Sequence, residues 1–138
     1  MSTEIPTAVL FGRERNALGE LCISLVESIR NDYFPRARLW EAFELMLVTK
    51  KIFNMHAVRR ATSASALARS TGLAPSTVQR RLTYLTKLGA VEKRGTQFVM
   101  CVPYANRPSA VEGFKRRMDL VEGFNVAASA GKIARKRA

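Results

Sequence analysis

The chain has 138 residues, of which 47% are hydrophobic and 25% charged, a composition typical of a folded globular domain. Its 23 lysines and arginines outnumber 11 acidic residues and give a net charge of +12. This balance favours a polyanionic partner, nucleic acid first and an anionic membrane surface second. Two cysteines argue against a disulfide framework or a structural zinc site. We therefore expect one domain that needs no cofactor.

The sequence offers little support for a membrane or secreted protein. The N-terminal residues lack the charged-then-apolar layout of a secretory signal. Apolar runs such as LCISLV and FVMCV are far too short to span a bilayer. The one weak candidate for a basic amphipathic surface helix, FKRRMDLVEGF, carries Asp119 and Glu122. These features predict a cytoplasmic protein without a membrane partner.

The N-terminal half predicts an arm and two helices. Residues 1–12 have few periodic cues and are expected to form a flexible arm. Residues 13–31 predict an amphipathic helix, which ends before Pro35 because the residue preceding a proline disfavours helix. Residues 36–59 predict a second helix that is apolar on most sides, so we expect it to be the central core helix. The apolar stripe of the first helix comprises Leu18, Leu21, Cys22, Leu25, Val26 and Ile29.

The C-terminal half predicts two short helices, a hairpin and a long helix. Gly72 ends a serine-capped, alanine-rich helix, and the next helix begins at Pro75 and ends at Gly89. The segment AVEKRGTQFVMCV alternates apolar side chains around a turn at Arg94-Gly95, which predicts a β-hairpin. A last helix is expected over 108–128, followed by a frayed basic tail, 131–138. That helix carries an apolar seam of Val111, Phe114, Met118 and Val121.

The order of these elements is that of a winged helix-turn-helix, and the spacing around the turn makes the match specific. Ala68 must be small because the following helix crosses close to it. Gly72 lets the backbone reverse, since glycine adopts positive φ without strain. Val78 fills the angle between the two helices. We therefore expect a mainly α protein with a small β-hairpin wing, in one domain over 13–130 with a DNA-binding core at 60–103.

The segment LARSTGLAPSTVQRRLTYLTKLGAVEK resembles the DNA-binding segments of the MarR and IclR repressor families. The helices flanking the winged unit are similar to the layout of MarR-type dimers, although the wing loop, EKRGTQ, is shorter than in that family. The resemblance implies a homodimer that binds a pseudo-palindromic duplex as a transcription regulator, with 13–31 and 108–128 as dimerisation helices. It also implies a small aromatic effector near the junction of these helices with the winged unit. Tyr33, Phe34, Trp40 and Phe43 are candidates for that pocket, although aromatic residues at helical spacing are usually core.

The charge distribution and the helical angles indicate which residues bind DNA. No acidic residue lies between Glu44 and Glu92, whereas lysines and arginines are frequent there. At about 100° per residue, Val78, Arg81, Leu82, Leu85 and Leu88 fall on the inward side of the second helix. Arg80 is placed to pair with guanine and Gln79 with adenine. The predicted DNA-binding residues are Arg69 on the first helix, Ser76, Thr77, Gln79, Arg80, Thr83 and Lys87 on the second, and Lys93 and Arg94 on the wing.

Other functions find less support. The chain has a single histidine, His56, no glycine-rich phosphate loop and no base beside a nucleophile, so we expect no enzyme. Cys22 lies on an apolar stripe, which favours an inert core cysteine over a redox sensor. A winged helix that binds protein or RNA remains the alternative. A protein-docking helix would expose apolar residues, and only Tyr84 on the second helix qualifies.

Overall fold

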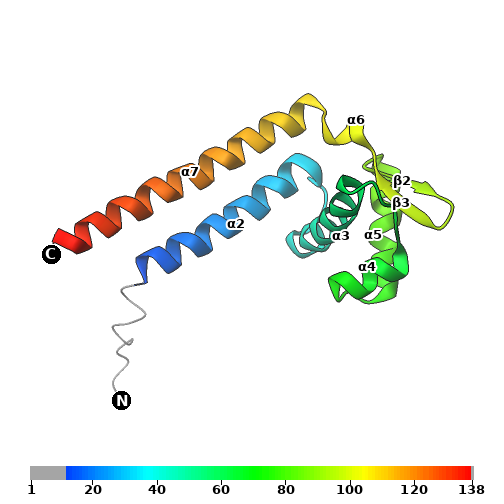
Figure 1. Cartoon of the computed structure of the whole chain (residues 1–138), viewed down its shortest axis with the longest axis horizontal. Helices are drawn as coiled ribbons and strands as arrows, with labels where there is room; N and C mark the ends of the chain where they lie inside the picture. Colours follow the sequence, from blue (N-terminus) through cyan, green and yellow to red (C-terminus); the bar gives the residue numbers. More distant parts are fainter. Residues whose placement is uncertain (1–11, 138) are drawn as a thin grey trace, which may run out of the picture.

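The computed structural model describes residues 12–137, apart from the side chains of Glu14 and of residues 129–137. The predicted arm therefore lies almost wholly outside the described residues. Figure 1 shows two long helices, α2 and α7, side by side and extending away from a body made of α3, α4, α5 and the sheet. The elements are α2 (Arg13–Tyr33), α3 (Leu39–Ala57), β1 (Thr62–Ser63), α4 (Ala64–Thr71), α5 (Pro75–Leu88), β2 (Val91–Arg94), β3 (Gln97–Met100), α6 (Val102–Ala105) and α7 (Pro108–Arg137).

The predicted helix-turn-helix forms with the expected ends. The Ser63 hydroxyl caps α4 by accepting a hydrogen bond from the Ala66 backbone N–H at 3.2 Å. Gly72 has φ 74°, which only glycine adopts without strain, and it ends α4. Pro75 then starts α5, where it fills a position whose N–H has no helical partner. These local signals position α5 across α4.

One apolar core holds α3, α4, α5 and the sheet together. Fully buried leucine, isoleucine and valine side chains meet from three helices, and Phe98 and Met100 cover them from β3. The largest of the fully buried side chains are Leu45, Ile52, Leu67, Leu82, Leu85, Val48 and Val78. Val78 thus fills the angle between α4 and α5, as predicted from its spacing.

The wing is an antiparallel sheet in the order β1-β3-β2. β2 and β3 form the predicted hairpin, with Arg94 opposite Gln97, so its two-residue turn is Gly95-Thr96, one residue later than expected. Gly95 has φ 65°, as a tight hairpin turn requires. β1 was not predicted because a two-residue strand has no periodicity of its own; it exists only by pairing with Gln97 and Phe98.

α2 and α7 are joined through one carboxylate. Asp32 accepts hydrogen bonds from Arg116 at 2.8 Å and from Arg117 at 2.7 Å. Gly113 lies against the Asp32 carboxylate, where a larger residue would collide with it. Arg117 also donates to the Tyr33 hydroxyl at 3.3 Å. From here on, we call this antiparallel pair of helices the arm; it is distinct from the predicted N-terminal arm of residues 1–12. α7 continues to Arg137, well beyond the predicted end at 128, so the expected frayed tail is helical up to that residue.

The structure corrects the prediction for α3. The helix begins at Leu39 and not at 36, because Pro35 lies in a turn closed by a hydrogen bond from the Ala37 N–H to the Phe34 carbonyl. It ends at Ala57, and Arg59 follows with φ 59°. The helix is buried on one side only, through Ala42, Leu45, Val48 and Ile52. Trp40 and Phe43, expected to be core, are 55% and 51% exposed in the single chain.

One further expectation about burial is wrong, and one short helix was not predicted. Cys22 is exposed and is not a core cysteine, because α7 covers a different side of α2. The short helix α6 lies between the hairpin and the last helix, where no element was predicted. No helix among residues 12–137 is long and apolar enough to cross a membrane.

An ion pair fixes α5 on α3. Arg81 faces inward, as its helical angle predicted, and its Nε donates to the Glu44 carboxylate at 2.9 Å. The two side chains are 11% and 22% exposed, and the guanidinium also lies 5.8 Å from the centre of the Trp40 ring. Glu44, the last acidic residue before the long basic stretch, is therefore used to hold the helix and does not face the solvent side of α5.

We expect Arg81→Met to lower the free energy of unfolding by about 1–3 kcal/mol, because the half-buried Glu44 carboxylate would lose its partner. The neighbouring Arg80 is exposed, so Arg80→Met should change it by no more than about 0.5 kcal/mol. Urea denaturation of both variants measures the difference. Equal stability of the two variants would contradict the structural role of Arg81.

Candidate nucleic-acid interface

α5 has one buried and one polar exposed side. Val78, Arg81, Leu82 and Leu85 are buried against the body. The opposite side consists of exposed polar or basic side chains at Ser76, Gln79, Arg80, Thr83 and Lys87. This is the distribution that the helical angles predicted. The solvent-facing surface of α5 is therefore polar, cationic and free of carboxylates.

Local hydrogen bonds organise the first turns of α5. The Arg80 guanidinium donates to the Thr77 hydroxyl at 3.4 Å, a long and exposed contact that leaves Arg80 free to reorient. Thr83 donates to the Gln79 carbonyl at 2.9 Å, which orients the Thr83 side chain along the helix. Thr77 is half-buried, unlike Ser76. The N–H groups of the first turn of α5 have no helical partners, which is favourable for an anion at this end.

The remaining predicted residues lie on neighbouring elements. Arg69 is exposed in the last turn of α4. Lys93 and Arg94 are exposed at the end of β2, next to the hairpin turn. Arg94 pairs with Glu92 at 3.3 Å, with side chains 69% and 50% exposed. An ion pair this exposed is worth about 0–1 kcal/mol, so Arg94 can exchange this partner for another anion.

The described residues form two hollows, of which the first was not located from the sequence. The first lies at the end of α3 beside the wing and is lined by basic residues, among them Arg59 and Arg60. Both arginines belong to the acid-free stretch, which was the only signal in the sequence. The second lies where the arm meets the body. Neither could be found from periodicity, because each is formed by segments far apart in the chain.

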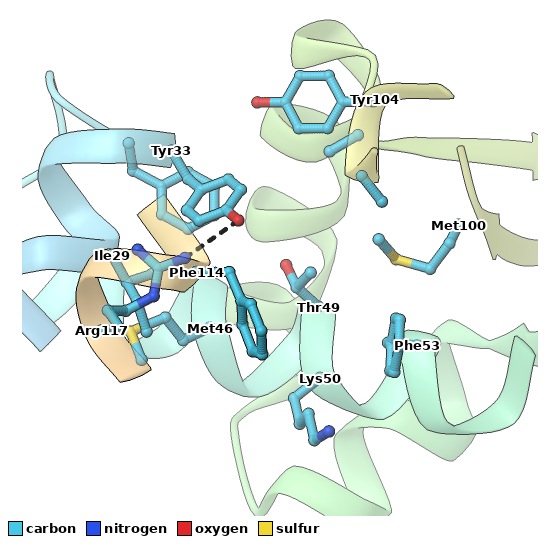
Figure 2. A pocket seen from close by; sticks show the side chains of 13 residues that line it. Ile29, Tyr33, Met46, Thr49, Lys50, Phe53, Met100, Tyr104, Phe114 and Arg117 are labelled. Carbon is cyan, nitrogen blue, oxygen red and sulfur yellow. Dashed lines mark hydrogen bonds between the residues drawn. The ribbon is translucent and has the colours of Figure 1, made fainter. Parts of the chain in front are cut away.

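The second hollow is an apolar cavity of about 450 Å³, and Figure 2 shows its lining. Tyr33 and Phe34 line it, as predicted, whereas Trp40 and Phe43 do not. Met46 and Phe53 come from α3, Met100 from β3 and Phe114 from α7. The cavity therefore contacts the arm, the core helix and the root of the wing together. We call it the junction cavity.

A few polar groups border the junction cavity. The Thr49 hydroxyl is buried there and has no hydrogen-bond partner among the residues that the structure describes. The Lys50 ammonium lies 5.0 Å from the centre of the Phe53 ring at the edge of the cavity. Burial raises the pKa of the Tyr104 phenol above its usual value, and the Arg107 guanidinium, 3.8 Å from the ring centre, opposes this shift. Tyr104 is therefore a neutral hydroxyl at physiological pH.

Among the described residues, no three histidine, cysteine, aspartate or glutamate side chains lie close enough together to hold a metal ion. His56, the one histidine, is half-buried and lines the basic hollow beside the wing.

The comparison with protein families agrees with the geometry. Residues 56–95 match the family model of the IclR helix-turn-helix domain. The matched segment runs from the last turn of α3 through α4 and α5 to the tip of the wing. The IclR-type resemblance is thereby confirmed for this segment, whereas the MarR-type resemblance stays a prediction. A comparison with curated proteins gives no match. The matched domain supports a DNA-binding regulator of transcription of the helix-turn-helix class.

Proposed function

We propose that this protein is a homodimeric regulator of transcription that binds a pseudo-palindromic duplex by inserting α5 into the major groove. The observation that carries this proposal is the polar side of α5, which is exposed and free of carboxylates although the other side is buried. Helices of this kind contact base edges with side chains of their first turns, here Gln79 and Arg80. Further contacts, mainly to phosphates, come from Arg69, Ser76, Thr77, Thr83, Lys87, Lys93 and Arg94.

A winged helix that binds a protein partner is the weaker alternative. Such a helix would present apolar side chains to its partner, and Tyr84, the one candidate on α5, packs against Phe34 with ring centres 6.2 Å apart. Selection of bound sequences from a random duplex pool at a stated salt concentration tests the proposal directly. A palindromic consensus is expected; binding that is indifferent to duplex sequence even in dilute buffer would contradict it.

Arg80→Ala should weaken binding to the selected duplex by about 1–3 kcal/mol and relax the preference at one base pair, because a bidentate contact to guanine would be lost. Lys115→Ala, the loss of an exposed charge on α7, is the control and should leave the base preference unchanged. Fluorescence anisotropy with duplexes that vary at each position measures both quantities. If Arg80→Ala weakened all sequences equally, Arg80 would contact phosphate and not a base.

The dimer is proposed from the exposed apolar surface of the arm. Val111, Phe114 and Met118, three members of the predicted seam, are 42%, 59% and 50% exposed on one side of α7. Leu18 and Ile23 on α2 are 49% and 56% exposed. Two helices alone cannot bury such surfaces, whereas two arms related by a two-fold axis would form a four-helix arrangement that does.

Met118→Glu should convert the dimer to a monomer, since it would place a charge in the apolar contact. Val102→Glu is the matched control, because Val102 is 48% exposed but lies on α6, outside the arm. Sedimentation velocity of both variants is the measurement. A tight dimer in Met118→Glu would remove the seam from the interface.

We further propose that the junction cavity binds a small aromatic effector. Its size is in the range of ligand sites, and its apolar lining with a few polar groups is typical of them. The unpartnered Thr49 hydroxyl and the Lys50 ammonium favour an aromatic molecule that carries an acidic group. Because the cavity contacts both the arm and the root of the wing, an occupant would alter the position of the arm relative to the body that contains α5.

Titration with 2-naphthoate, an aromatic carboxylate, should shift the NMR signals of the Met46 and Met100 methyl groups, which line the cavity. The Met118 methyl lies outside the cavity and is the internal control. Ala105→Leu should reduce the shifts, because it fills part of the cavity. Equal shifts at all three methionines would indicate non-specific binding and would contradict the proposal.

A further inference from the structure

The outer face of the wing sheet carries a basic cleft. It has a volume of about 460 Å³ and is lined by His56, Arg59 and Arg60 from the end of α3 and by Arg94 and Gln97 from the wing. Side chains alternate along β3, so Phe98 and Met100 join the apolar core whereas Gln97 and Val99 face the other way. Val99 is only 7% exposed and is one of the residues that line the cleft.

Arg59, one of the arginines that line this cleft, occupies an unusual backbone position. The Arg59 N–H donates to the His56 carbonyl and the Arg60 N–H to the Met55 carbonyl, both at 2.9 Å. This is the Schellman ending of a helix, in which a left-handed residue, usually glycine, follows the cap. Arg59 has φ 59° there. A non-glycine residue in this region strains the backbone.

The same chain provides the comparison. At the end of α5 the Gly89 N–H donates to the Thr86 carbonyl and the Ala90 N–H to the Leu85 carbonyl, which is the same motif with glycine at the left-handed position. The left-handed position that ends the helix is therefore occupied by glycine after α5 and by a strained arginine after α3. The arginine at this strained position is one of the residues that line the cleft.

The charges of Arg59 and Arg60 are not neutralised within the described part of the chain. Neither Arg59 nor Arg60 has a carboxylate within 4.0 Å among the described side chains. Glu92 reaches only Arg94, through an exposed pair. Convergent guanidinium groups bind phosphate through paired, charge-assisted hydrogen bonds.

We propose that the cleft binds a phosphate of the duplex backbone outside the segment that α5 contacts. The inference rests on the proposed function, because DNA must first be bound by α5. Arg94 and Gln97 lie at the tip of the hairpin, where the proposed wing contact is made, and the cleft continues from them toward Arg59 and Arg60. A duplex that passes the wing tip therefore meets the cleft next, and its negative charge is complementary to the lining.

The decisive variant is Arg59→Gly, which removes the charge and relieves the strain together. Its melting temperature should rise by roughly 2–6 °C, since glycine is the preferred residue at this position. Two duplexes with the same selected sequence are compared, one ending at the site and one extended by about ten base pairs on each side. Affinity for the short duplex should be unchanged, whereas affinity for the extended duplex should fall about 5–10-fold, with a salt slope smaller by about 1.

Arg36→Ala, the loss of an exposed arginine on the loop before α3, is the control for charge alone. It should change the affinity for the short and the extended duplex by the same factor. An equal effect of Arg59→Gly on both duplexes, or no effect on either, would overturn the proposal. A titration with inorganic pyrophosphate tests whether the cleft binds a free phosphate compound instead of DNA. The proposal would also be overturned if Arg59→Gly abolished pyrophosphate binding but left the affinity for the extended duplex unchanged. In each of these cases a loss of specificity in Arg80→Ala would leave the role of α5 intact.

Discussion

The packing of α5 on α3 is the constraint on which the other features depend. Val78, Leu82 and Leu85 bury one side of α5, and Arg81 extends this contact by pairing with Glu44. A helix held in this way has only its opposite side available for a partner. Glu44 is the last carboxylate before Glu92, and it points from α3 toward the buried side of α5, where it pairs with Arg81. The same contact that stabilises the body therefore keeps negative charge away from the exposed side of α5.

The arm and the body meet at a small set of contacts. Asp32 ties α7 to α2 through Arg116 and Arg117, and Arg117 continues to Tyr33 at the junction cavity. Phe114 and Arg117 from the arm thus face Met100 at the root of the wing across the cavity. Closely packed interiors transmit displacement, and a cavity removes that packing between the arm and the body. In the proposed dimer, an occupant of the cavity would therefore be coupled to the spacing of the two α5 helices.

The basic surface has two parts that differ in how they are formed. The exposed side of α5 is a property of one helix, with residues that recur at helical spacing. The cleft beside the wing combines the end of α3 with β2 and β3, and its Arg59 occupies a position where Gly89 stands in the related ending of α5. Both parts lie within or directly beside the segment that matches the IclR helix-turn-helix domain.

The sequence alone determined the features that depend on neighbours along the chain. Ala68, Gly72 and Val78 predicted the turn between α4 and α5, and helical angles separated Arg80 from Arg81, because caps, turns and periodicity are local. Only the tertiary structure decided that β1 exists, that Trp40 and Cys22 are exposed, and that Glu44 is the partner of Arg81. It also decided where the junction cavity and the basic cleft lie. These features depend on which distant segments are brought together, and neither spacing nor composition records that.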